Sequence, residues 1–150
     1  QWYGASDKVM GGISDVSVSY GKYDDRHCLF LTGKVCLENN GGFVQAALNL
    51  AKSGDTIDAS RYVGVRLVVR GNSEKYSVHL RTLDNDRPWQ SYRASFTAFP
   101  RWKTISLPFV NFPPYRVEVP LDTTKLKRIG LVAIGRAVDA DLALAKISFY

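Results

Sequence analysis

Apolar and polar residues alternate one by one along much of this chain. Val16, Val18 and Tyr20, for example, share one parity, and Ser17 and Ser19 share the other. A period of two places successive side chains on opposite faces of an extended backbone, so this pattern predicts a strand with one buried face. The pattern recurs between turn-forming residues. We predict strands before Asp7 and at 16–20, 28–37, 43–50, 63–70, 76–82, 90–98, 102–107, 129–134 and 142–150.

Helical periodicity is almost absent, and many short strands joined by turns predict an all-β, two-sheet sandwich. The 28–37 segment is apolar on both faces, which is typical of a central strand. Short helical turns are expected at 58–61 and at 121–126, the second capped by Asp122 or Thr123. The parity of the apolar residues shifts within 142–150, which predicts a β-bulge near Ala145-Lys146.

Turn chemistry predicts two hairpins. The sequence Asn39-Asn-Gly-Gly42 separates 28–37 from 43–50, and Gly71-Asn72 separates 63–70 from 76–82. Asn and Gly favour the tight turns that join paired strands. The segment 108–120 carries four of the six prolines, so it should be a surface loop rather than a central strand. Three aromatic residues of this loop either fix it to the core or are offered to a partner: Phe109, Phe112 and Tyr115.

The composition fits one domain, residues 1–150, with 45% hydrophobic and 23% charged residues. No apolar run approaches the roughly 20 residues of a transmembrane helix, and no signal-peptide pattern is visible. The net charge of +6 favours anionic partners. The basic residues are nevertheless scattered, with only one short cluster at 125–128. Without a nucleic-acid-binding motif or a basic stripe, nucleic acid is not a favoured ligand.

Cys28 and Cys36 are the only cysteines, and they lie at opposite ends of one predicted strand. At about 3.3 Å per residue, the two thiols are too far apart for a disulfide. Free thiols are typical of a reducing compartment. We therefore expect an intracellular protein, which would be cytoplasmic in a bacterium or mitochondrial if the chain is a trimmed eukaryotic one.

Two glycine pairs, Gly11-Gly12 and Gly41-Gly42, stand at the entrances of predicted strands. Glycine is required where the backbone adopts a positive φ or where another group approaches closely. We expect tight structural corners at both pairs.

A resemblance runs through the residues around these corners and extends over nearly the whole chain. It includes Trp2, Asp7-Lys-Val-Met-Gly-Gly-Ile-Ser14, Asn39-Asn-Gly-Gly-Phe43, Tyr76-Ser-Val-His-Leu-Arg81, Leu107-Pro-Phe109 and Ile147-Ser-Phe-Tyr150. In these segments the chain resembles the complex I intermediate-associated protein family, which supplies assembly factors for respiratory NADH:ubiquinone oxidoreductase. The resemblance implies a jelly roll of the galactose-binding-like kind. It also implies structural roles for its motif residues: Trp2, Asp7, Met10, Gly11, Gly12, Asn40, Gly41 and Gly42.

Candidate catalytic and metal chemistry is sparse. His27 and His79 are the only histidines, and carboxylate pairs such as Asp84/Asp86 and Asp139/Asp141 fall in predicted loops. These loop carboxylates are chemically suited to calcium, but no EF-hand spacing is present and solvated turn residues are the favoured interpretation. The family has no established catalytic set. We therefore predict no enzyme activity, no cofactor and no metal.

A candidate binding face lies on the polar side of the central strands. It combines guanidinium, imidazole and amide groups with aromatic rings: His79, Arg81, Trp89, Gln90, Tyr92 and Arg93. Arg and aromatic side chains are typical of binding surfaces. The alternative is a solvated sheet face with the aromatic rings partly in the core. We predict a module that docks to protein, either subunits or assembly factors of a respiratory complex. A carbohydrate-binding module of the same fold is the alternative.

Overall fold

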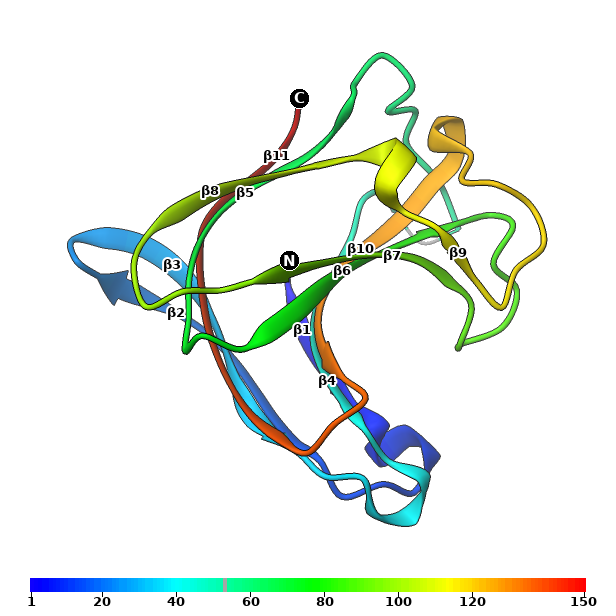
Figure 1. The fold of residues 1–150 in the computed structure, drawn as a ribbon. Helices are drawn as coiled ribbons and strands as arrows, with labels where there is room; N and C mark the ends of the chain where they lie inside the picture. Colours follow the sequence, from blue (N-terminus) through cyan, green and yellow to red (C-terminus); the bar gives the residue numbers. More distant parts are fainter. Residues whose placement is uncertain (53) are drawn as a thin grey trace.

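The computed structural model describes residues 1–52 and 54–150, and two antiparallel sheets pack face to face in it (Figure 1). A six-stranded sheet has the order β1-β4-β10-β6-β7-β9, and a five-stranded sheet has the order β2-β3-β11-β5-β8. The strands are β1 (Tyr3–Ser6), β2 (Asp15–Tyr23), β3 (Arg26–Val35), β4 (Phe43–Asn49), β5 (Gly64–Arg70), β6 (Lys75–Thr82), β7 (Ser91–Thr97), β8 (Lys103–Pro108), β9 (Pro114–Tyr115), β10 (Leu126–Ile134) and β11 (Val138–Phe149). The predicted all-β jelly-roll sandwich is confirmed.

Each predicted strand is present, with ends shifted by a few residues, and only the two-residue β9 was not predicted. The core lies between the sheets, and it is formed by the apolar residues that the alternation placed on the inner face of each strand. On β5, for example, Val65, Leu67 and Val69 are buried, and Arg66 between them is exposed. The apolar segment 28–37 becomes β3, a central strand paired with β2 and β11. The alternation of buried and exposed residues therefore accounts for the positions of the strands and for the side of each strand that faces the core.

The two predicted hairpins are wrong. β3 and β4 lie in different sheets, and so do β5 and β6, so both turns carry the chain from one layer to the other. The reason is that turn chemistry reverses the chain without choosing the partner strand. At the second crossing, Gly71 N–H and Ser73 N–H donate to the carbonyls of Phe99 and Ala98 instead of closing a hairpin.

The shorter predictions have mixed outcomes. The register of β11 shifts between Leu144 and Lys146, which confirms the β-bulge. A 3₁₀ turn, η4 (Thr123–Lys125), is capped by Asp122 as predicted. The helical turn at 58–61 is wrong, because the Asp58 carboxylate accepts from the Ser60 N–H and forms a local turn instead.

The 108–120 segment is a surface loop with one anchored side. It contains the 3₁₀ turn η3 (Phe109–Asn111), followed by the buried Phe112 and then β9. Cys28 and Cys36 are unbridged, as predicted. None of the helical turns in the described part of the chain has the length or apolarity to cross a bilayer.

One buried carboxylate organises the corner that carries both glycine pairs. Asp7 begins the 3₁₀ turn η1 (Asp7–Met10), and η2 (Glu38–Asn40) lies beside it at the same end of the sandwich (Figure 1). The Asp7 carboxylate accepts hydrogen bonds from the Ser14 N–H (3.0 Å), the Ser14 hydroxyl, the Gly42 N–H (2.5 Å) and the Phe43 N–H (3.2 Å). The first turn of the chain is thereby tied to the start of β4.

The glycines around Asp7 serve two different needs. Gly11 has a φ of 86°, which favours glycine, whereas Gly12 and Gly41 have no positive φ. A Cβ on Gly12 would lie 2.3 Å from Asp7 Oδ1, and one on Gly41 would lie 2.7 Å from Asp7 Oδ2. Gly12 and Gly41 therefore make room for the carboxylate, which is the close-approach role of glycine. Trp2 packs against the core and Met10 is exposed, while the Asn40 side chain lies outside the described part of the structure.

Candidate binding groove

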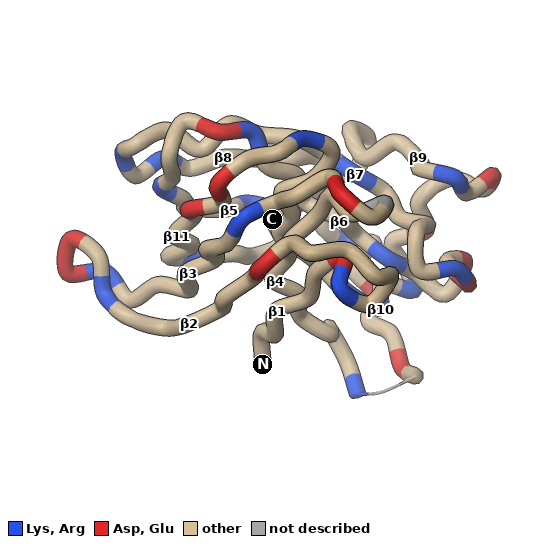
Figure 2. The backbone as a smooth tube through the Cα atoms, turned by 90° about the horizontal axis from the view of Figure 1, so that it is seen from below, with Lys and Arg blue, Asp and Glu red and all other residues tan. Residues whose placement is uncertain are grey.

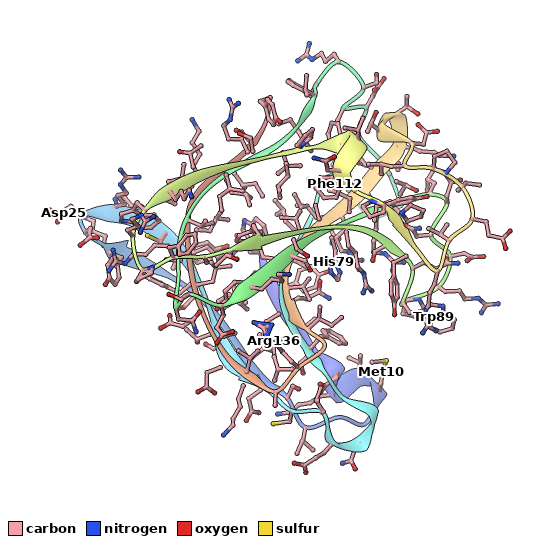
Figure 3. The ribbon with its side chains drawn as sticks, viewed as in Figure 1. Met10, Asp25, His79, Trp89, Phe112 and Arg136 are labelled. Atoms are coloured by element: carbon pink, nitrogen blue, oxygen red, sulfur yellow. The ribbon has the colours of Figure 1, made fainter. Side chains whose placement is uncertain are left out.

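A groove of about 500 Å³ lies on the outer face of the six-stranded sheet. β4, β10, β6 and β7 form its floor, η1 forms one wall, and the segment before β7 together with β9 forms the other. Figure 3 shows Met10, His79 and Trp89 in this region. The residues that line it are Val9, Met10, Phe43, Gln45, His79, Pro88, Trp89, Arg93, Tyr115, Arg116, Val132 and Ile134.

Strand register divides the floor into an apolar end and a polar end. Phe43 pairs with Ile134, and Val132 follows on the same face, so the end beside η1 is aliphatic and aromatic. Farther along the sheet, His79 stands opposite both Gly130 on β10 and Arg93 on β7. The groove can therefore contact an apolar group and a polar group of one ligand at the same time.

The walls carry exposed apolar side chains. In η1, Val9 is 82% exposed and Met10 is 55% exposed, and across the groove Trp89 is 52% exposed. On the same side as Trp89, the Arg93 guanidinium lies 3.6 Å from the centre of the Tyr115 ring. This distance is typical of a cation–π contact, which fixes Arg93 at the edge of the groove.

His79 is a partly buried histidine at the polar end. Its Nε2 lies 2.8 Å from the Ser77 hydroxyl. Burial, and then the neighbouring Arg93 charge, lower the pKa of His79 to about 3. The imidazole is therefore neutral at physiological pH and can take part in hydrogen bonds with a ligand without adding charge.

His79, Arg81 and Arg93 share the outer side of the sheet, as the alternation predicted, and their role in binding stays a prediction. Arg81, however, is engaged in the protein itself. Its Nη1 donates to the carbonyls of Arg87, Pro88 and Gln90, each at 3.0 Å.

Gln90 also holds this segment in place. Its side-chain oxygen accepts from the Asp86 and Arg87 N–H groups, and its nitrogen donates to the Arg116 carbonyl at 3.1 Å. Arg81 and Gln90 therefore hold the segment that presents Trp89.

Tyr92 does not belong to this face. Its side chain is fully buried between the sheets, and its hydroxyl donates to the Val119 carbonyl at 2.8 Å. The period-two pattern had already placed Tyr92 on the same side as Ala94 and Phe96, both of which are buried. The prediction of Tyr92 as a binding residue was wrong. The alternation along the strand determines the side of the sheet on which a side chain lies, and the aromatic character of the residue does not.

A second hollow of about 600 Å³ lies along β2, β3 and β11, against side chains on their core-facing side, and is more open than the groove. It is lined by Trp2, Tyr20, Lys22, His27 and Cys28 among others. The Trp2 N–H donates to the Tyr20 hydroxyl there, at 3.3 Å. The groove is the better candidate, because it is more enclosed and combines an apolar floor with converging polar groups.

A family model described as Complex I intermediate-associated protein 30 (CIA30) matches residues 1–145. The chain belongs to this family. No protein among the curated ones matches the sequence.

The family member shares its fold with carbohydrate-binding modules. The family 11 module of the cellulosomal cellulase Lic26A-Cel5E of Clostridium thermocellum superposes with a TM-score of 0.76 at 14% identity, covering 99% of this chain and 86% of that one. A family 11 module from Clostridium thermocellum in complex with a β-1,3-1,4-mixed-linked tetrasaccharide gives a TM-score of 0.75 at 15% identity, with 99% of this chain and 87% of that one covered. A family 30 module gives 0.69 at 15% identity, with 97% and 79% covered. At these identities the likeness shows the fold alone.

Several groove residues were not predicted as binding residues. They are Val9, Phe43, Gln45, Pro88, Tyr115, Arg116, Val132 and Ile134, and Met10 was expected only as a motif residue. Phe43 and Gln45 have the outward parity of β4, so the alternation placed them outside the core. The missing information was that β4 and β10 lie beside β6, which the incorrect hairpins concealed.

Within the described residues, no cluster of three His, Cys, Asp or Glu side chains could hold a metal ion. One of the carboxylates considered for calcium, Asp84, forms an ion pair with Lys125 at 2.9 Å. Asp84, which was expected to be a solvated turn residue, is therefore half-buried and paired with Lys125.

We expect the stability of the protein to fall as the pH is lowered below 6.5, because of His79. In the unfolded chain this imidazole binds a proton near pH 6.5, whereas in the folded chain it stays neutral down to about pH 3. Above pH 6.5 the free energy of unfolding does not depend on the protonation of His79. At pH 5 proton binding by the unfolded chain has lowered the free energy of unfolding by about 2 kcal/mol. Urea titrations should show a weaker pH dependence of the free energy of unfolding for His79→Gln than for the wild type. A wild-type dependence in the His79 variant would contradict this assignment.

We expect Arg81→Gln to loosen the segment that carries Trp89. The variant loses three hydrogen bonds from a charged donor, which should cost about 2 kcal/mol of unfolding free energy. Hydrogen exchange of the amides in 84–90 should become at least about tenfold faster. Arg87→Gln, at an exposed side chain in the same segment, is the control and should exchange as the wild type does. Unchanged exchange in the Arg81 variant would show that the three bonds do not order this wall.

Proposed function

We propose that this chain is a non-catalytic docking module whose groove binds a polypeptide segment of a partner during the assembly of respiratory complex I. The observation that carries the proposal is the apolar end of the groove. Phe43, Val132 and Ile134 form its floor, and Val9 and Met10 stand exposed along its wall. Membership of the complex I intermediate-associated family supports the assembly context.

The chemistry of this apolar end favours side chains of a polypeptide. Exposed apolar groups gathered in a hollow are costly unless a partner covers them. Met adapts its shape to different apolar partners, and Trp, Tyr and Arg are the residues most enriched where partners bind tightly. Met10, Trp89, Tyr115 and Arg93 all line this groove. A volume of about 500 Å³ accommodates a few side chains.

Carbohydrate binding is the second candidate function. The fold is that of carbohydrate-binding modules, and one of these is described in complex with a mixed-linked tetrasaccharide. Trp89, Gln45 and His79 are suited to a sugar ring and its hydroxyl groups. Against this, Arg93 covers one face of Tyr115, and the apolar end of the floor, formed by Phe43, Val132 and Ile134, provides no hydrogen bond for a hydroxyl. The polypeptide ligand therefore fits the groove better.

Affinity capture from extract of the native source tests the proposal. The immobilised protein should retain complex I subunits or assembly proteins, and Met10→Glu should reduce their capture by about tenfold or more, because it places a charge on the apolar wall. Val110→Glu is the matched control, since Val110 is 92% exposed in η3 and does not line the groove. Equal capture by the Met10→Glu and Val110→Glu variants would show that the groove does not bind these proteins. Binding to mixed-linked glucan without capture of such proteins would support the second candidate.

A further inference from the structure

Four arginines surround the polar end of the groove. Arg81, Arg93 and Arg128 project from β6, β7 and β10, and Arg116 follows β9. Figure 2 marks the Lys and Arg positions along these strands. Among the described residues, no aspartate or glutamate lines the groove or the small hollow of about 70 Å³ that continues it. The local charge is therefore positive.

This charge is not compensated within the described part of the chain. None of the four arginines takes part in any of its ion pairs. Arg81 donates to backbone carbonyls, and Arg128 Nε donates to Asn49 Oδ1 at 3.0 Å. Neutral acceptors satisfy individual N–H groups, but they leave the net charge in place.

The arginines also repel one another. Burial and then the Arg128 charge lower the pKa of Arg81, and burial also lowers the pKa of Arg93, with Arg116 contributing in the same direction. Partial burial strengthens such repulsion, because fewer water molecules screen it. A bound anion would relieve it and would be held by charge-assisted hydrogen bonds.

We propose that the groove selects an acidic polypeptide segment, in which a Glu or Asp carboxylate meets Arg93 and Arg116 while a neighbouring apolar side chain covers Phe43 and Ile134. This inference rests on the proposed function and adds the chemistry of the partner. Both arginines line the same groove as the apolar floor, so one short segment can reach both ends. An anionic polysaccharide satisfies the arginines but leaves the apolar end of the floor uncovered, and the peptide is therefore the better fit.

A selection from random displayed dodecapeptides tests the inference on the intact protein. We expect enrichment of Asp or Glu close to Leu, Ile, Met or aromatic residues. One selected peptide is then synthesised with its acidic residues and with Gln in their place. The acidic form should bind at least about tenfold more tightly at low salt, and most of this advantage should disappear at 0.5 M NaCl.

Variants assign the preference to the groove. Arg116→Gln removes a charge from an exposed side chain, so the fold should persist, and the preference for the acidic form should drop at least about threefold. Arg93→Gln should reduce it further, with folding checked by circular dichroism. Arg101→Gln, at an exposed arginine outside the groove lining, should keep the full preference.

The outcomes separate this inference from the proposed function. Equal binding of the acidic and the Gln peptide overturns the selection for acid, while the proposed docking of a polypeptide stands. Full preference in the Arg116 and Arg93 variants also overturns the inference, because the charge then acts elsewhere. Failure to select any peptide, with binding to polygalacturonate or to mixed-linked glucan instead, overturns both.

Discussion

Replacing Asp7 by Ala should lower the free energy of unfolding by about 3–5 kcal/mol and the melting temperature by roughly 10 °C. The Asp7 carboxylate is fully buried and accepts four hydrogen bonds, from the backbone N–H groups of Ser14, Gly42 and Phe43 and from the Ser14 hydroxyl. Without the carboxylate these donors lose their acceptor inside the protein. Calorimetry and urea titration measure the loss directly.

The same carboxylate should make the protein sensitive to strong acid. Burial acts to raise the pKa of Asp7, but the hydrogen bonds from Ser14, Gly42 and Phe43 outweigh it and lower the pKa below the ordinary 3.8. Its stabilisation is therefore present above pH 3.8 and is lost as the pH falls through the lower pKa of the folded state. Asp15→Ala is the control, because Asp15 is exposed and forms only a surface ion pair with Lys8. A change below about 1 kcal/mol for Asp7→Ala would show that Asp7 does not hold this corner.

Much of the fold could be predicted from the sequence, because burial between two sheets imposes a period of two. Val65, Leu67 and Val69 repeat their parity, and so do Tyr92, Ala94 and Phe96, so strand positions and core faces follow from the pattern. The period-two pattern does not determine which strands pair with each other. A strand with one apolar face fits either sheet, and the turn before β4 contains the residues of a hairpin although it crosses between layers.

The candidate site was predictable only where it depends on a single strand or on two consecutive ones. His79 and Arg93 pair across β6 and β7, which follow each other in the sequence, and their shared face was predicted. Phe43 and Ile134 reach the same groove from β4 and β10, about 90 residues apart, and no local pattern connects them. The apolar end of the groove therefore appeared only in the structure.

The groove has a fixed floor and two walls, each held by hydrogen bonds from its own side of the chain. Asp7 joins the wall that carries Val9 and Met10 to Phe43 at the edge of the floor. Arg81 orders the wall that carries Trp89. The predicted loss of stability at Asp7 should therefore be accompanied by weaker ligand binding, since the apolar wall would no longer be held in place.

A methyl group added at Gly41 should be much more costly than the same methyl group added at Gly11. A Cβ on Gly41 would lie 2.7 Å from Asp7 Oδ2, 2.7 Å from the Cys36 carbonyl oxygen and 2.9 Å from the Glu38 carbonyl oxygen. Two of these oxygens belong to the backbone, so the whole turn must move to admit the methyl group. We expect Gly41→Ala to lower the free energy of unfolding by about 3 kcal/mol and the melting temperature by roughly 10 °C.

Gly11→Ala isolates the other reason for a glycine. Gly11 has a φ of 86°, but a Cβ there would meet no atom within 4 Å, so only backbone strain of about 1 kcal/mol is expected. Thermal melts of the two variants therefore separate two costs at one corner of the fold. Gly41→Ala measures the cost of steric crowding, and Gly11→Ala measures the cost of backbone strain. If both variants lose the same stability, the crowding expected at Gly41 would be contradicted. If only Gly41→Ala is strongly destabilised, crowding by Asp7 Oδ2 and by the Cys36 and Glu38 carbonyl oxygens is the reason that this turn admits no side chain.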